Sequence, residues 1–360
     1  MAKNLLSTYL QFSLISGIIT LIGGKSKEVL CMLTKKQNLL ETIRGGKPDR
    51  YVNQYEALAM VVMNPYMAHN PQAEYGKGPV KNAWGVTNVW PEGTPGGFPV
   101  HDEEHIVCKD ITHWKDYVHA PSLDYSDADW EPFVKEAEKI DRNEYFVTQF
   151  IAPGIFEQCH HLQEIQNCLM NFYEEPEATQ ELIDYLTDWE LQYAEKICKY
   201  IKPDAIFHHD DWGSQASTFI SPAMFEEFIF PAYKKIYGYY KSHGVELIIH
   251  HSDSYAATLV PYMIDMGIDI WQGTMSSNNI PELIQKYGGQ ITFMGGIDSA
   301  SIDRPDWTKE LVEQEVRKVC RENGTKYFIP CLTQGLGIST FPGVYEAASE
   351  VIDEISKEVF

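Results

Sequence analysis

Short apolar runs alternate with longer amphipathic stretches from residue 145 to the end of the chain. Each run has the length and composition of a buried strand, and the stretches between them have helical spacing. The expected strands are 145–153, 204–213, 245–254, 268–274, 290–298 and 326–335. The expected helices are the segment that ends at 201, and then 221–244, 256–267, 280–288, 307–324 and 342–360. This order predicts parallel β-α-β units.

One or two further strands before residue 145 would complete an α/β fold of the single (β/α)8 TIM-barrel type. A doubly wound open sheet is the alternative, but no GxGxxG follows a strand. Near the N-terminus we expect a helix over 33–44 that stops at Gly45-Gly46, and another over 130–140. Residues 56–120 are irregular and rich in Pro, Gly and Trp, which is typical of a lid over a site.

Residues 1–31 do not fit this rhythm. The run from Leu5 to Gly24 has no charge and is about as long as a membrane span, but only Lys3 precedes it and no cleavage site follows. Met32 opens a segment that resembles a natural protein start. We therefore expect 1–31 to be an N-terminal extension, from a misplaced start codon or as an apolar helix. We expect 32–360 to be the barrel domain, with no membrane contact of its own.

The charge balance narrows the classes of partner. The chain has 51 acidic and 29 basic residues and a formal net charge of −22, which repels nucleic-acid phosphates and anionic lipid. Nucleic-acid binding is therefore excluded as a main function.

The seven cysteines include no CxxC pair. A disulfide framework is therefore not expected, and we expect the protein to work in a reducing cytoplasm.

Polar residues follow the apolar part of several expected strands. In a barrel, such strand ends meet at one mouth. His251 and Asp253 would lie on the same face of their strand and could bind a metal, or form a pair that only orders the loop. Cys331, two strands later, could be a third ligand or an ordinary core residue. We take His251, Asp253 and Cys331 as the predicted metal ligands.

His209 and Asp211 belong to the densest polar cluster, 208–211. Adjacent strand residues face opposite sides, so at most one of the two His residues and one of the two Asp residues would enter the barrel. A charged carboxylate there could position a cation, and a protonated one could donate a proton; a solvated loop is the alternative. Glu157 follows another strand and could reach the mouth, or be an ordinary first-turn residue. We take Asp211, His209 and Glu157 as candidate catalytic residues.

Several tryptophans lie in loops or at strand ends, where they could form an apolar pocket for a planar or methylated ligand. Packing of the core or lid is the alternative. The candidate substrate-binding residues are Trp84, Trp90, Trp212 and Trp271.

Several motifs resemble those of the uroporphyrinogen decarboxylase superfamily, and the resemblance covers about 32–360. The motifs are Lys47-Pro48-Asp49-Arg50, Asp210 to Gln215, Ile220-Ser221-Pro222 with Phe225, Pro231 with Lys234-Lys235-Ile236, His251-x-Asp253, Met294 to Asp298, and Pro342-Gly343-Val344. The resemblance implies a barrel. Decarboxylases of this superfamily use no cofactor and hold a polycarboxylate with an Arg-rich N-terminal loop. Here residues 49–56 contain a single Arg, and acidic residues follow, which disfavours decarboxylation.

The other branch of the superfamily comprises corrinoid-dependent methyltransferases. Its thiol-directed members hold zinc with His-x-Cys and a later Cys. In this chain that position reads His251-Ser252-Asp253, so a carboxylate replaces a thiolate, and aligning His250 instead would place Ser252 there. Cys331 is the candidate late cysteine. The replacement weakens the case for thiol activation, because thiolate-rich sites favour bound thiolates.

Other members of this branch take a methyl group from an O-methyl or N-methyl substrate. The resemblance thus implies a methyltransferase (an O-demethylase component) that passes methyl from a small substrate, such as an aromatic methoxyl compound, to Co(I) on a partner corrinoid protein. Zinc would act as a Lewis acid. No cobalamin-binding Asp-x-His-x-x-Gly motif occurs, so the cobalamin would come from the partner.

Three alternatives stay open: a decarboxylase-like lyase, a methylcorrinoid:thiol methyltransferase, and a corrinoid-binding scaffold without activity. A homodimer is compatible with any of them.

Overall fold

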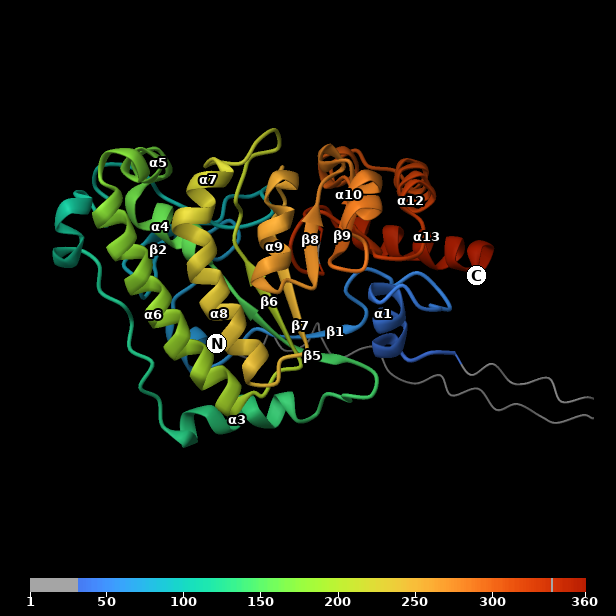
Figure 1. Ribbon diagram of the computed structural model, residues 1–360, viewed down its shortest axis with the longest axis horizontal. Coiled ribbons are helices and arrows are strands. Elements are labelled where there is room, and N and C mark those ends of the chain that lie inside the picture. The colour runs from blue at the N-terminus through green and yellow to red at the C-terminus, as the bar shows by residue number, and fades with distance from the viewer. Residues whose placement is uncertain (1–31, 338) are drawn as a thin grey trace, which may run out of the picture. The chain divides into compact units, whose positions relative to one another are not determined.

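Seven strands, all parallel, form the central curled sheet of the computed structural model, which describes residues 32–337 and 339–360. The order of neighbours follows the chain (Figure 1). The strands are β1 (Leu58–Val61), β5 (Phe146–Ile151), β6 (Ala205–His209), β7 (Leu247–His251), β8 (Ile270–Thr274), β9 (Thr292–Ile297) and β10 (Phe328–Leu332). The six strands expected after residue 145 are thus confirmed, and β1 is one of those expected before it.

Helices alternate with the strands, and most of them lie along the outer side of the sheet (Figure 1). They are α1 (Lys35–Ile43), α2 (Pro65–His69), α3 (Asp127–Ala137), α4 (Ile155–Gln163), α5 (Ile165–Glu174), α6 (Pro176–Tyr200), α7 (Pro222–Met224), α8 (Phe230–Ser242), α9 (Val260–Met266), α10 (Ile280–Tyr287), α11 (Ser299–Ile302), α12 (Lys309–Asn323) and α13 (Val344–Val359). Short 3-10 turns occur at Ile111–Asp116, Ala257–Leu259 and Ser276–Asn278, and a π-helical turn at Phe225–Ile229.

Helix α1 shows how local sequence sets these boundaries. The Thr34 side chain accepts a hydrogen bond from the Gln37 backbone N–H, and the Gln37 side chain accepts one from the Thr34 N–H, which is a capping box. The helix ends just before Gly45, whose φ of +66° suits glycine, as expected from the Gly-Gly stop.

Alternation of side chains along the strands divides the core in two. Phe207, Ile249 and Ile270 point into the space that the sheet encloses, where Leu39 of α1 joins them. Their neighbours in sequence, such as Ile206 and Ile248, pack instead against the surrounding helices. The strands are therefore buried on both faces, as expected for a parallel sheet covered by helices.

A segment of irregular backbone bridges the two edge strands, β1 and β10. Gln54, 1% exposed, accepts a hydrogen bond from Leu332 N (3.3 Å) and donates to Ser349 Oγ (2.8 Å) and the Tyr345 carbonyl (3.3 Å). The Tyr55 hydroxyl donates to the Gln334 carbonyl (3.0 Å). Within the described residues, β1 and β10 do not pair, so the expected closed barrel of eight strands is not confirmed.

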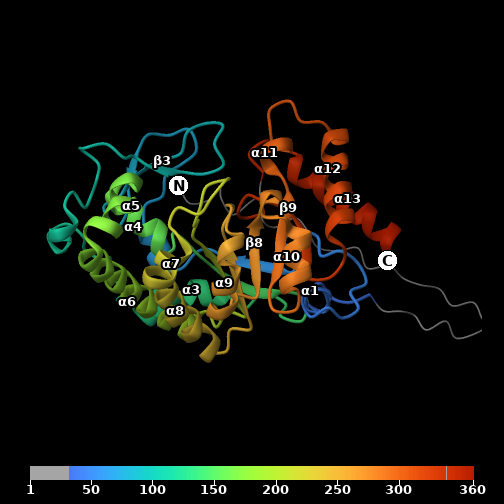
Figure 2. The same ribbon diagram turned by 45° about the horizontal axis from the view of Figure 1, so that its top comes forward.

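Residues 56–120 are more ordered than their composition predicts. Besides β1 and α2 they contain a small antiparallel sheet of β2 (Val80–Lys81), β3 (Thr87–Val89) and β4 (Phe98–Pro99). Figure 2 shows this sheet beside α4 and α5, and Cys108 N donates to the Leu162 carbonyl of α4 (2.8 Å).

The expectations for residues 1–31 fall outside the described residues. None of the helices in the described ranges is long and apolar enough to cross a membrane.

The bridging role of Gln54 can be tested with Gln54→Leu. This change leaves the buried Leu332 N–H without its acceptor, so we expect the free energy of unfolding to fall by about 1–3 kcal/mol in urea denaturation. The exposed Gln314→Leu is the control and should change stability by less than about 0.5 kcal/mol. Equal stability of the two variants would show that the bridge contributes nothing.

Candidate functional site

Three potential metal ligands meet at the ends of β6 and β7. Parallel pairing puts His209 directly beside His251, and their rings stack with centroids 4.3 Å apart. One ligand atom from each of His209, Asp211 and His251 lies within 4.8 Å of the other two. The His251 Nε2 atom is 3.8 Å from Asp211 Oδ1. We refer to these three residues as the metal-ligand cluster.

Gln272 of β8 fixes the orientation of His251. Its amide nitrogen donates to the Leu332 and Gln334 carbonyls, both at 3.3 Å, so its oxygen faces the His251 Nδ1 atom and accepts from it. Nδ1 therefore carries a proton, and the lone pair of Nε2 points toward the cluster. Burial, assisted by the neighbouring His209, lowers the pKa of His251 to about 4, so the ring is neutral.

Glu157 holds the second imidazole. Its Oε2 atom lies 2.9 Å from His209 Nδ1. Burial alone would lower the pKa of His209, but the carboxylates of Glu157 and Asp211 outweigh burial and raise it to about 10. Without a metal, His209 is thus an imidazolium in an acidic environment.

Asp210, next to Asp211 in sequence, points the other way and places Glu157. It accepts hydrogen bonds from the backbone N–H groups of Phe156 (3.0 Å) and Glu157 (2.7 Å) at the start of α4. The Trp212 indole (2.9 Å) and the Tyr233 hydroxyl (2.5 Å) also donate to it.

The same contact requires glycine at position 154. A Cβ atom at Gly154 would lie 2.4 Å from Asp210 Cβ and 2.3 Å from the Tyr233 hydroxyl. Any side chain there would therefore push the start of α4 away from β6, and Glu157 would move with it.

A third carboxylate adjoins the cluster. The Asp253 backbone N–H donates to Asp211 Oδ1 (2.9 Å), which ties the loop after β7 to the end of β6. Burial and the nearby Asp211 carboxylate raise the pKa of Asp253 to about 8. Asp253 is therefore a carboxyl group that keeps its proton at neutral pH.

The other two strand-end histidines, His208 and His250, belong to a separate series of hydrogen bonds on the outer face of the sheet. His250 Nε2 lies 3.1 Å from the Asp210 carbonyl, which only accepts, so this nitrogen carries a proton. His250 Nδ1 then accepts from the Tyr237 hydroxyl (2.7 Å), which in turn accepts from His208 Nδ1 (2.8 Å). These hydrogen bonds hold the strand ends from the outer face of the sheet, while His209 and His251 lie on the opposite face, in the metal-ligand cluster.

The loop after β10 covers the two imidazoles of the cluster. A Cβ atom at Gly335 would lie 3.3 Å from His251 Cε1 and 3.5 Å from His209 Cδ2. Neither Gly335 nor Gln272 was expected from the sequence. Gln272 could have been noticed as a lone amide within an apolar strand.

The predicted ligands are distributed differently from the expectation. His251 belongs to the cluster, together with His209 and Asp211, which were expected as catalytic residues. Asp253 lies beside the cluster. The Cys331 thiol packs 3.9 Å from Gln272 Nε2, on the far side of the amide from His251, and burial raises its pKa. Cys331 is thus part of the enclosed core.

The four predicted tryptophans are also separated. Trp212 and Trp271 are fully buried: Trp212 stacks on His250 with centroids 3.9 Å apart, and the Trp271 indole donates to the Ser252 carbonyl (2.9 Å). Trp90 packs against Tyr75 of the same irregular region. Trp84 lines a cavity next to α4.

The protonation of Asp253 predicts a pH-dependent stability of the metal-free protein. Between about pH 4 and 8 the folded chain holds a proton that the unfolded chain has lost, so this group lowers stability as the pH rises. Asp253→Asn removes this loss. Relative to wild type, it should gain about 2–4 kcal/mol of unfolding free energy between pH 5 and pH 8 in chelator-containing buffer. The control is the exposed Asp188→Asn, and parallel curves for wild type and Asp253→Asn would refute the assignment.

Comparisons with known proteins agree with this architecture. The chain is similar over 90% of its length to 99% of a methyltransferase from Methanosarcina mazei, with a TM-score of 0.62 and 15% sequence identity, which shows a shared fold. A protein from Anabaena variabilis described as a sugar phosphate isomerase/epimerase matches 63% of this chain and 91% of its own, at 11% identity and a TM-score of 0.30, too low to carry an argument. No curated protein matches the sequence. The sequence model of uroporphyrinogen decarboxylase (URO-D) matches residues 157–355, more than half of the chain, and the protein therefore belongs to the uroporphyrinogen decarboxylase family.

Proposed function

We propose that this protein transfers a methyl group from a small O-methyl substrate to the Co(I) centre of a partner corrinoid protein, with zinc held by His209, Asp211 and His251. The observation that carries the proposal is the metal-ligand cluster: two histidines and a carboxylate converge at the strand ends, and each histidine is oriented from behind.

The donor set fits zinc. Two imidazoles and one carboxylate, with a remaining open position, are typical of catalytic zinc sites. Each imidazole has its Nδ1 atom engaged, His251 by the Gln272 amide and His209 by Glu157, which leaves Nε2 for the metal. Zinc bound there would supply a Lewis acid for a leaving oxygen. His209 would lose its extra proton when the metal binds.

The electrostatics of the site argue against a polycarboxylate substrate. The charged groups that raise the pKa of His209 are the carboxylates of Glu157 and Asp211. A substrate with many negative charges would be repelled by them, whereas a neutral methyl ether would not. This supports methyl transfer over decarboxylation within the family.

Asp253 is suited to supply the proton of the reaction. When the bond between methyl carbon and substrate oxygen breaks, the methyl group passes to the electron-rich cobalt of the partner and the oxygen keeps the bonding pair. The oxygen then needs a proton to leave as an alcohol or phenol. Asp253 is protonated at neutral pH and lies beside the cluster, so it can act as the general acid. Glu157 keeps His209 in place.

Transfer in the direction of a thiol is less well supported. The cluster offers nitrogen and oxygen ligands, and the Cys331 thiol lies behind the Gln272 amide with a raised pKa. A thiolate substrate is best activated by a site rich in sulfur ligands.

Metal content and turnover test the proposal together. We expect about one zinc per chain in wild type, at least about tenfold weaker zinc binding in His209→Ala, Asp211→Ala and His251→Ala, and unchanged binding in Cys331→Ser. Wild type with zinc should demethylate a methoxyl compound when a Co(I) corrinoid protein is present, and the three ligand variants should not. Loss of zinc in Cys331→Ser but not in His209→Ala would restore the ligand set His251, Asp253 and Cys331. Full turnover by metal-free wild type would overturn the role of zinc.

Gln272 should affect metal binding without touching the metal. Gln272→Ala frees the His251 ring and its tautomer, so zinc affinity should fall about 10–100-fold while circular dichroism stays unchanged. The matched control, Gln290→Ala, alters an exposed residue and should bind zinc as wild type does. An unaltered affinity in Gln272→Ala would show that the Gln272 amide does not orient His251.

A further inference from the structure

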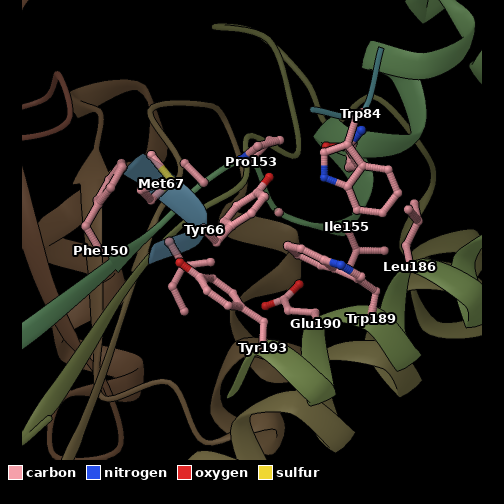
Figure 3. Close-up of a pocket in the computed structure, with 14 residues that line it drawn as sticks. Tyr66, Met67, Trp84, Phe150, Pro153, Ile155, Leu186, Trp189, Glu190 and Tyr193 are labelled. Carbon is pink, nitrogen blue, oxygen red and sulfur yellow. The ribbon is translucent and has the colours of Figure 1, made fainter. Parts of the chain in front are cut away.

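A pocket lies beside the first turn of α4, and none of the residues of the metal-ligand cluster lines it. Glu157 points to His209, whereas the next residue, Gln158, lines this pocket. The walls come from α2, from the end of β5 and from α6 (Figure 3). Its free volume is about 30 Å³. Since one water needs roughly 10–15 Å³ of such space, a guest of about two or three non-hydrogen atoms fits.

Aromatic rings dominate the walls. Trp189 of α6 packs edge-on against Trp84 and Tyr66, with ring centroids 5.0 and 5.2 Å apart, and it stacks on Tyr193 at 5.4 Å. None of the residues that line the pocket is Lys or Arg. Aromatic faces without a resident cation attract a positively charged guest.

A buried carboxylate stands among these rings. Glu190 is 4% exposed and lies between Tyr193 and Trp189 in Figure 3. His208 Nε2 lies 3.0 Å from Glu190 Oε1, a contact that becomes an ion pair when the histidine is protonated, but Oε1 accepts no hydrogen bond from the part of the chain that the structure describes. A buried carboxylate oxygen without a donor is costly, so a guest that supplies N–H groups would stabilise it.

Gln158 adds an adaptable group. Its side-chain nitrogen is buried and has no partner in the described residues. Rotation of the amide presents either its oxygen or its nitrogen to the same space, so Gln158 could accept a hydrogen bond from the guest.

We propose that this pocket is a binding site for a small ammonium ion of about the size of methylammonium. The ammonium group would donate to Glu190, and its carbon would lie against the rings of Tyr66, Trp84 and Trp189. Because Tyr66 and Trp84 belong to residues 56–120, whereas Trp189 and Glu190 belong to α6, the ion would hold that region against the barrel. The site needs neither the metal nor the corrinoid partner, so its failure would leave the proposed methyl transfer untouched.

The test uses the full chain and the two tryptophans of the pocket as reporters. Methylammonium chloride is titrated while tryptophan fluorescence and heat of binding are recorded, with sodium chloride at the same ionic strength as the reference. We expect saturable binding of methylammonium, and binding weaker by at least about tenfold for methanol, its neutral analogue, and for tetramethylammonium, which is too large. An equal response to methanol, or no saturable response beyond that of sodium chloride, would overturn the proposal and leave a pocket that holds only water.

Two variants locate the binding. Glu190→Gln keeps the shape and removes the charge, so methylammonium affinity should fall at least about tenfold, whereas Glu195→Gln, an exposed position on the same helix, should bind as wild type does. If circular dichroism shows that Glu190→Gln does not fold, Trp84→Leu takes its place with the same expectation. Wild-type affinity in a folded Glu190→Gln or Trp84→Leu would show that methylammonium binds elsewhere.

Discussion

The in-register pairing of β6 with β7 is the constraint on which the site depends. It sets His209 against His251 on the inner face, and alternation then places His208 beside His250 on the outer face. A shift of one residue in either strand would move its inner histidine to the outer face and its outer histidine to the inner face. Each pair would then be split, and the metal-ligand cluster would lose one imidazole. The buried outer pair, His208 and His250, therefore stabilises the register in which the inner pair faces a ligand.

The charges of the side chains at these strand ends follow from their burial and from their neighbours. His251 is neutral because it is buried, His209 is cationic because carboxylates surround it, and Asp253 is neutral because it is buried and the Asp211 carboxylate lies nearby. Asp210 contributes indirectly, as an acceptor for the start of α4. The adjacent residues 210 and 211 thus serve a helix and a ligand cluster respectively, which agrees with the principle that consecutive strand-end residues face opposite sides.

Much of this architecture could be predicted from the sequence. The strands after residue 145 are unbroken apolar runs between turn residues, so both their existence and their polar ends were readable. A strand before residue 145 was expected, but the position of β1 was not predicted, because its four residues are all half-exposed and lie in a segment rich in Pro, Gly and Trp. At the site, the sequence identified His209, Asp211, His251 and Glu157, but not their grouping. Which of them share a centre depends on distances across strands, and these also place Gln272 between Cys331 and His251.

The first turn of helix α4 carries two consecutive side chains that serve different sites. Successive residues of a helix point about 100° apart, so Glu157 reaches His209 of the metal-ligand cluster while Gln158 lines the aromatic pocket. A movement of this turn would displace both side chains. A guest that displaces Gln158 would therefore also move Glu157, and with it the imidazole of His209. One peptide unit joins the two residues, and Asp210 holds the backbone just before it through the N–H groups of Phe156 and Glu157.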